Sequence, residues 1–186
     1  MTTYQVLDGS GLLKYVYGLG TGTSGDPYRL VSKRYSNALC EDGKIFVHND
    51  RHTIANGATF YYLLKTPASP IKVTLYELSI SANAVPISYD FFEDAILSAN
   101  GTIDLAFNNN RQIGTASATA LYYTPTVTST GTALLSDIIN GDKTTGGSST
   151  GEFRVVLKAS ANYLLAIINN SGVSSTIAPF IKFSET

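Results

Sequence analysis

The sequence predicts an all-β protein: an antiparallel two-sheet sandwich, jelly-roll-like, behind an extended, glycine-rich N-terminal arm. Three observations lead to this prediction. Short segments rich in Tyr, Phe, Val, Ile, Leu and Thr recur along the chain, turn residues separate them, and only 15% of the residues are charged. Sandwiches of 186 residues usually form one domain with a sizeable core. We therefore expect an arm at 1–44 and a β-sandwich domain at 45–186.

The predicted arm differs in composition from the rest of the chain. One apolar cluster at 12–17 leads into a run with glycines at positions 18, 20, 22 and 25. Such a run is costly to order, so it becomes fixed only when something packs on it. It lacks the Gly-Lys-Ser/Thr ending of a P-loop and the dinucleotide fingerprint, which favours an arm over a phosphate site. The apolar residues that a partner could bury are Tyr15, Tyr17, Leu19, Tyr28 and Leu30.

The strongest strand signal lies at 59–66 and 71–81, which we interpret as two adjacent strands. Pro67 and Pro70 lack N–H groups, so they belong to the connection. In the second strand apolar residues alternate with polar ones, which is the period of a sheet with one wet face. Glu77 interrupts the apolar face, which favours a position at an edge or an interface.

Seven further segments have strand character, several of them bounded by Asx-Gly turn pairs. They are 45–48, 87–92, 102–107, 118–123, 153–158, 163–168 and 176–183. In 102–107, Ile103, Leu105 and Phe107 alternate with the other residues. Two places, 91–96 and 134–139, show helical spacing over too few residues to predict a helix. The segment 163–168 is apolar on both faces, which predicts a central strand or one that a second chain covers.

The chain offers little catalytic chemistry. His48 and His52 flank Asp50, but i, i+4 spacing brings two imidazoles together on a helix, and this segment is predicted to be extended with a turn. The sequence therefore favours ordinary histidines over metal ligands. Cys40 is the only cysteine, so no internal disulfide can form.

Three carboxylates cluster at Asp90, Glu93 and Asp94. A carboxylate pair could hydrolyse glycosides at a suitable separation, but solvated loop acids are the more economical interpretation. We therefore predict no catalytic residue, no cofactor and no metal. A net charge of -1 provides no electrostatic field that would attract nucleic acid or a membrane surface, so we expect neither as a partner. We also expect no transmembrane helix and no signal peptide, because the sequence has no long apolar run and no basic segment followed by an apolar one at its N-terminus.

The polar stretch 108–112 offers a second contact surface. Its amides and single arginine can each make several hydrogen bonds, which is typical of either a plain loop or a self-association loop. The residues that we assign to self-association are Asn108, Asn110, Arg111, Leu164, Ala166 and Ile168.

A succession of short motifs runs along the chain. In chain order they are 15–18, 22–28, 42–46, 75–77, 100–102, 108–111, 123–125, 131–132, 157–158, 163–164 and 169–171. In this order the motifs resemble those of a family of small structural proteins of tailed bacteriophages, in particular capsid decoration, or cement, proteins. The chain departs from the family at its end, where residues 180–185 stand in place of a Trp-Tyr-Glu strand.

The resemblance implies a jelly-roll body, a homotrimer, no enzymatic activity and the major capsid protein as partner. It also implies a place on the capsid exterior after synthesis in the host cytoplasm. We expect the arm to grip the particle and the strand 163–168 to contribute to the trimer interface. The alternative function is a tail, fibre or baseplate component that binds a host-surface glycan.

Overall fold

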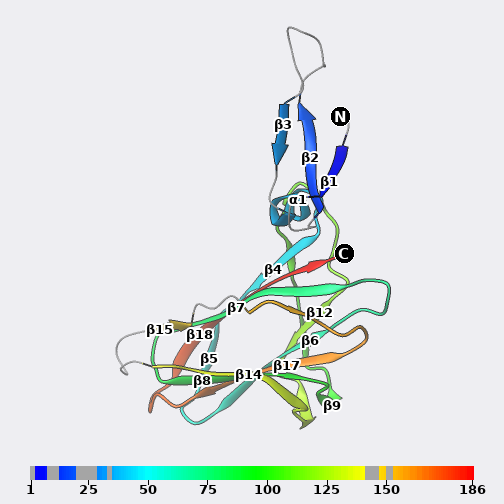
Figure 1. The fold of residues 1–186 in the computed structure, drawn as a ribbon. Coiled ribbons are helices and arrows are strands. Elements are labelled where there is room, and N and C mark those ends of the chain that lie inside the picture. The colour runs from blue at the N-terminus through cyan, green and yellow to red at the C-terminus, as the bar shows by residue number, and fades with distance from the viewer. Residues whose placement is uncertain (1–2, 8–12, 20–28, 33–34, 141–146, 150–152) are drawn as a thin grey trace. The chain divides into compact units, whose positions relative to one another are not determined.

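The computed structural model describes residues 3–7, 13–19, 29–32, 35–140, 147–149 and 153–186. The chain divides into two compact units, an N-terminal unit at Met1–Gly43 and a body at Lys44–Thr186. The body is all-β, as predicted (Figure 1). No helix among these residues has the length and apolar character needed to cross a bilayer.

The N-terminal unit contains a small antiparallel sheet, where an extended arm was expected. Its strands are β1 (Thr3–Leu7), β2 (Leu13–Leu19) and β3 (Arg29–Ser32), in that order. A short helix follows, α1 (Tyr35–Glu41), which carries Cys40. Gly43 ends the helix with a positive φ of 66°, and its N–H donates to the carbonyl of Cys40 at 3.1 Å.

The body contains one sheet of six strands and one of seven, together with a separate strand pair; five strands of the seven-stranded sheet form its main path, and two more pair with strands of that path. The strands of the six-stranded sheet are, in spatial order, β10 (Thr102–Asp104), β12 (Ala120–Tyr123), β6 (Thr59–Lys65), β17 (Asn162–Asn169), β8 (Ile87–Glu93) and β14 (Thr132–Ile139). The other sheet contains β11 (Phe107–Asn108), β4 (Ile45–Asn49), β18 (Ser175–Glu185), β7 (Val73–Ala82) and β15 (Gly147–Ser149), with β16 (Val155–Val156) on β7 and β5 (His52–Ile54) on β18. The separate pair is β9 (Ile96–Ala99) with β13 (Thr126–Ser129).

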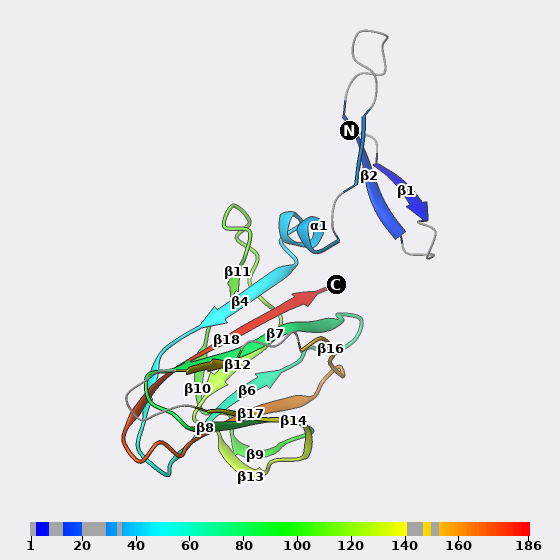
Figure 2. The same cartoon turned by 60° about the vertical axis from the view of Figure 1, so that its left-hand side comes forward.

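The pairing of early strands with late ones gives the body its jelly-roll character. β4 pairs with β18, β6 with β17, β7 with β15 and β16, and β8 with β14, all antiparallel. These four sets of paired strands follow one another along one long hairpin, and successive sets lie alternately in one sheet and in the other. Rolling such a hairpin produces two facing sheets, which Figure 2 shows as the β18–β7 layer and the β17–β8–β14 layer.

The core lies between these two sheets and follows the expected alternation. Tyr163, Leu165 and Ile167 of β17 all belong to it. In β7 the alternation changes phase, because Lys182 pairs with Glu77 but the next residue, Phe183, pairs with Leu75. The resulting β-bulge turns Leu75 and Leu78 to the same side, so Glu77 interrupts the sequence pattern without entering the core.

Residues 91–105 and 121–135 form a structural repeat at the closed end of the long hairpin, where β8 ends and β14 begins. Each copy leaves the six-stranded sheet at a residue with positive φ, Asp94 (60°) or Thr124 (53°), and returns through Gly101 or Gly131. The first ten residues of both copies show the same succession of buried, half-buried and exposed positions. The copies interlock, since β8 pairs with β14, β9 with β13 and β10 with β12.

The β9–β13 pair lies on the outer side of the six-stranded sheet, away from β7 and β18, in both Figure 1 and Figure 2. Its paired residues Leu97 and Val127 are half-buried, whereas Ile96 is 60% exposed, so one face of the pair is covered. On the outer face of the sheet, Leu63 and its partner Leu164 are 0% exposed. The chain therefore covers both faces of β17 by itself.

Several local predictions are corrected. The strands β6 and β7 lie in different sheets, so the Pro67–Pro70 connection crosses the sandwich and joins strands that are not neighbours. At the two places where helical spacing was too short to predict a helix, residues 91–93 and 134–139 are strand, because partner strands pair with them. The expected strand at 102–107 is divided between the two sheets, and that at 153–158 contains only the short β16.

Candidate functional site

The segment 102–108 joins the edges of the two sheets and carries the features that fit a functional role. Its first part, β10, lies at the edge of the six-stranded sheet, and its last part, β11, pairs with β4 at the edge of the other sheet. The segment therefore closes one open side of the sandwich, and its side chains point either into the sandwich or toward solvent.

The outward side chains are Ile103, Leu105 and Phe107, which we call the edge stripe. Their exposed fractions are 64%, 62% and 49%. The predicted alternation is present, but its direction is opposite to that of a core strand, because Asn108 is buried while the apolar residues face solvent. A row of exposed apolar side chains at alternate positions along a sheet edge is typical of a contact surface.

The loop after β11 holds itself together through its asparagines. The Asn108 side chain accepts a hydrogen bond from the N–H of Asn110 at 2.9 Å, and that of Asn110 accepts one from the N–H of Gln112 at 3.1 Å. Arg111 is exposed, and its guanidinium lies 5.5 Å from the centre of the Phe107 ring. Asn108 and Asn110 thus shape the loop, while Arg111 extends the edge stripe.

The inward side of the same segment contributes to a group of ionisable residues, His48, Asp50, His52 and Asp104, which we call the His–Asp cluster. The register explains how three of them meet. Asn49 pairs with Phe180 and His52 with Ile177, so β4 and β5 form one extended line across Asp50 and Arg51. Alternate residues of this line share a face.

The sequence argument against a histidine pair was wrong on this point. Spacing of i, i+4 brings side chains to one face of a helix, but it does the same in a strand, where every second residue shares a face. Phe46 and Ile54, the flanking positions on that face, are 2% and 3% exposed, which identifies it as the inner face. The pattern Phe-x-His-x-Asp-x-His-x-Ile was the signal in the sequence.

The cluster is tightly spaced. His48 Nε2 lies 3.4 Å from Asp104 Oδ2, and His52 Nε2 lies 3.3 Å from Asp50 Oδ2. Neither contact has the geometry of a hydrogen bond, because both Nε2 atoms and Asp104 Oδ2 are buried without a hydrogen-bond partner. Potential ligand atoms of Asp50, His52 and Asp104 all lie within 4.8 Å of one another.

Aromatic rings enclose the cluster. The His52 ring stacks on Phe60 with centroids 4.5 Å apart, and lies 5.0 Å from Tyr123 and 5.5 Å from Tyr62. Burial, with the nearby charges of Asp104 and Asp50, raises the pKa of the Tyr62 hydroxyl above its ordinary value of 10.0. This hydroxyl therefore stays protonated, and it too lacks a hydrogen-bond partner.

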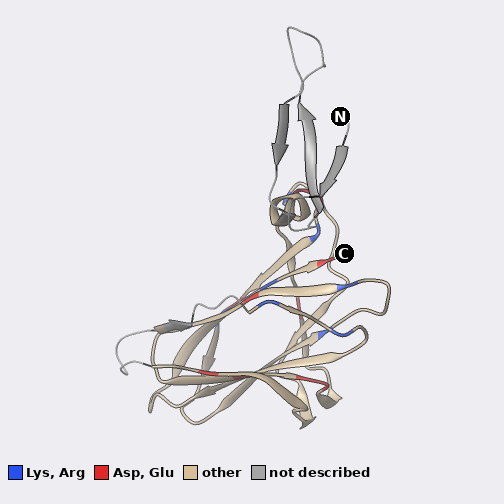
Figure 3. Cartoon of the chain, in the orientation of Figure 1, with Lys and Arg blue, Asp and Glu red and all other residues tan. Residues whose placement is uncertain are grey.

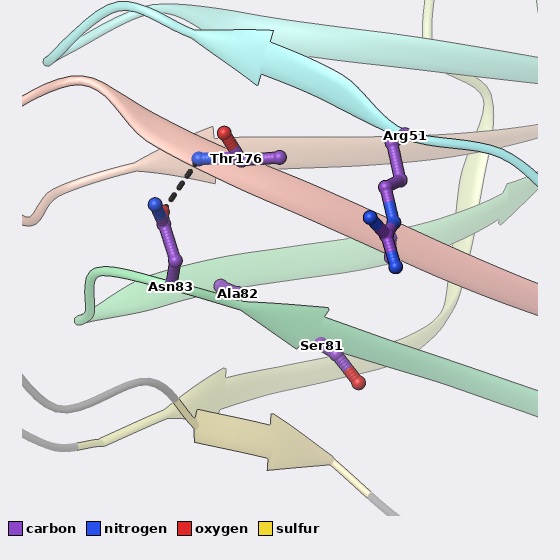
Figure 4. Close-up of a pocket in the computed structure, with 6 residues that line it drawn as sticks. Arg51, Ser81, Ala82, Asn83 and Thr176 are labelled. Carbon is purple, nitrogen blue, oxygen red and sulfur yellow. Dashed lines mark hydrogen bonds between the residues drawn. The ribbon is translucent and has the colours of Figure 1, made fainter.

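The outer face of the other sheet carries a surface hollow of about 390 Å³ (Figure 4). It is lined by Arg51, Ser81, Ala82, Asn83, Thr176 and Ala178. The N–H of Thr176 donates to Asn83 Oδ1 at 2.7 Å, which fixes the rim between β7 and β18. Arg51 is the only charged side chain in this lining. Figure 3 shows that most positions along the strands of the body are uncharged.

Two of the three clustered carboxylates, Glu93 and Asp94, form a surface ion-pair group with Lys158. Lys158 Nζ lies 3.2 Å from Glu93 Oε1 and 2.6 Å from Asp94 Oδ2. Hydrogen bonds to the two carboxylates raise the pKa of Lys158, and the bond to Asp94 contributes more than the bond to Glu93. Glu93 and Asp94 share this lysine, which fits the expectation of solvated acids at the end of β8.

The residues predicted for self-association and capsid binding occupy different environments. Leu164 and Ala166 are 0% and 4% exposed within a single chain, so the uncovered face that motivated the trimer prediction does not exist there. Ile168 is half-buried. Of the arm residues, Tyr15, Tyr17 and Leu19 occupy alternate positions of β2 and Leu30 lies on β3, while Tyr28 lies outside the described residues.

No family model matches the chain, and no curated protein matches it.

Proposed function

We propose that the chain is a structural protein of a tailed-bacteriophage particle, which decorates the outside of the capsid and stabilises it by binding the major capsid protein. The succession of motifs that resembles the decoration-protein family supports this proposal, and a jelly-roll body is the fold that the resemblance implies.

The observation that carries the proposal is the division of the chain into two units. Every residue of the main hydrophobic core among the described residues lies between Phe46 and Phe183, inside the body. Because the body closes its own core, the N-terminal unit is not required to complete it. We assign attachment to the capsid to this N-terminal unit, with Tyr15, Tyr17 and Leu19 of β2 as the first residues to test.

We also propose that the edge stripe joins neighbouring copies of the body in a homotrimer. The stripe replaces Tyr163–Ile168 as the proposed interface, because that strand is covered within one chain. Ile103, Leu105 and Phe107 expose apolar area on an open sheet edge, and association would remove that area from water.

A reconstitution experiment tests the attachment. Full-length protein and a chain of residues 44–186 are each added to particles stripped of the native protein, and the washed particles are compared on a stained gel. We expect the full-length chain to bind at a copy number near that of the major capsid protein and the shorter chain to stay in solution with unchanged circular dichroism. If the shorter chain binds, the contact with the capsid lies on the body. If this protein is only a minor band on the gel of native particles, the result favours the tail or fibre alternative.

Light scattering tests the trimer separately. The double variant Ile103→Ser, Leu105→Ser is expected to be monomeric at a concentration where the wild-type chain is trimeric. Ile96→Ser, which removes a similarly exposed isoleucine from β9, serves as the matched control and should remain trimeric. A monomeric wild-type chain, or a trimeric double variant, would refute the assignment.

A further inference from the structure

We propose that the His–Asp cluster binds one divalent transition-metal ion of the zinc class, with His48, Asp50, His52 and Asp104 as ligands. The proposal does not depend on the proposed function. It rests on the positions of four side chains, three from the strands β4, β5 and β10 and that of Asp50 from between β4 and β5, and on the hydrogen bonds that orient them.

The first argument is that the cluster contains buried polar atoms with no hydrogen-bond partner. Five such side-chain atoms occur in the described part of the chain, and four of them are His48 Nε2, His52 Nε2, Asp104 Oδ2 and the Tyr62 hydroxyl. Buried polar groups are nearly always satisfied, and each one left unsatisfied lowers stability. His48 is 1% exposed and Tyr62 0%, so bulk water does not serve them.

The second argument concerns the tautomer of His48. Its Nδ1 lies 3.3 Å from the carbonyl oxygen of Leu105, which can only accept, so this contact is a hydrogen bond when Nδ1 carries the proton. In the neutral ring Nε2 then presents a lone pair to the Asp104 carboxylate 3.4 Å away. Two acceptors repel each other unless a cation lies between them.

The third argument is that both aspartates are oriented in the same way. Asp104 Oδ1 accepts the N–H of Leu105 at 2.8 Å, and Asp50 Oδ1 accepts the N–H of Arg51 at 2.7 Å. Each carboxylate thus turns its Oδ2 toward a histidine Nε2. Metal ligands are typically held by such outer hydrogen bonds, a histidine through its second nitrogen and a carboxylate through its second oxygen.

The spacing and the charge select the ion. Two ligands bound to one tetrahedral ion at about 2.1 Å lie about 3.4 Å apart, which matches both nitrogen–oxygen contacts. Among Asp50, His52 and Asp104 the potential ligand atoms lie within 4.8 Å of one another, so these three ligands close by at most about 1.4 Å on binding. Imidazole ligands favour zinc, copper, iron or nickel over calcium and magnesium, and two carboxylates balance a divalent charge.

The experiment uses full-length protein in a Cys40→Ser background, so that the thiol cannot bind the probe. The chain is stripped with a chelator and titrated with Zn²⁺ by calorimetry and with Co²⁺ by visible absorption, with Mg²⁺ as the oxygen-preferring comparison. We expect one Zn²⁺ per chain, the intense visible bands of tetrahedral Co²⁺, and a rise in Tm of roughly 5–10 °C at a Zn²⁺ concentration 100 times Kd.

Two variants assign the ligands. Asp50→Asn changes a side chain that is 48% exposed, so it should fold, and His52→Gln removes one nitrogen ligand. Each is expected to weaken Zn²⁺ binding at least tenfold. Asp42→Asn, an exposed aspartate after α1, is the matched control and should bind like the parent.

The proposal is overturned if the stripped protein binds neither Zn²⁺ nor Co²⁺, or if Asp50→Asn and His52→Gln both bind like the parent. A proton in place of the metal is the competing explanation. In that case NMR would show His48 protonated on both nitrogens at neutral pH, and Zn²⁺ would leave the Tm unchanged.

Discussion

Gly131→Ala tests the interlock between the two copies of the structural repeat. Gly131 has a φ of +84°, and a Cβ built there would lie 2.1 Å from Glu93 O, 2.9 Å from Asp94 C and 3.0 Å from Ala95 N. All three are backbone atoms of the other copy, so no side-chain rotation relieves the contacts. The positive φ costs alanine roughly 1–2 kcal/mol, and displacing the packed backbone adds about 1–3 kcal/mol. We expect the free energy of unfolding to fall by about 2–5 kcal/mol.

Gly57→Ala separates these two contributions. Gly57 also has a positive φ, +72°, but a Cβ there would meet nothing within 4 Å. This variant should therefore lose only the conformational part, roughly 1–2 kcal/mol. Gly101→Ala, whose Cβ would lie 2.3 Å from Tyr123 O, should resemble Gly131→Ala.

Urea unfolding followed by circular dichroism measures all three variants against the wild type. The reasoning requires Gly131→Ala to lose at least about 1 kcal/mol more than Gly57→Ala. Equal losses would refute it, because they would mean that the backbones of β8 and β14 separate without cost where the two copies cross.

Three further predictions concern buried groups of the body. Leu164→Asp should unfold the body rather than dissociate an oligomer, because Leu164 is 0% exposed in one chain; light scattering combined with circular dichroism distinguishes the outcomes. Glu185→Gln should lower stability in urea by about 2–4 kcal/mol, because the carboxylate accepts hydrogen bonds from Ser117 Oγ and from the N–H groups of Ala118 and Thr119; an unchanged midpoint would contradict this. Burial raises the folded-state pKa of Tyr62 and Tyr163. The contribution of these two tyrosines to the free energy of unfolding is therefore complete below about pH 10. It is lost as the pH rises further, by up to about 1.4 kcal/mol per pH unit for each tyrosine. Urea titrations at pH 9 and 11 measure that loss, and Tyr163→Phe should reduce it.

The strands with clean alternation or continuous apolar character could be predicted from the sequence, and the jelly-roll fold followed from their number and spacing. β6, β8 and β17 match the predicted segments closely. The strands β9 and β13 were missed, because Ile96 is exposed and the pair covers another sheet without forming a core face of its own. The structural repeat was also missed, because its two copies share a backbone path and a burial pattern but few identical residues.

The edge stripe and the His–Asp cluster were predictable only in part. Period-2 spacing places His48, Asp50 and His52 on one face, and this could have been inferred once the segment was recognised as a strand. The contribution of Asp104 could not, because it depends on the crossing of 102–108 between the sheets. The same crossing explains why Ile103 and Leu105 face solvent, although their alternation resembles that of a buried strand.

The antiparallel pairing of β4 with β18 places both ends of the body at one point. The N–H of Glu185 donates to the carbonyl of Lys44 at 2.9 Å, next to the junction with the N-terminal unit. At the opposite end of β18, about 33 Å away along the strand, the turn after β17 meets two other turns through hydrogen bonds from Asn170 to Pro86 and from Gly172 to Asn56. A peptide fused to the C-terminus would therefore emerge at the end of the body that begins with Lys44. One inserted at Gly172 or Val173, in an exposed turn, would be carried at the far end of the body, which makes that turn the better position for displaying a cargo.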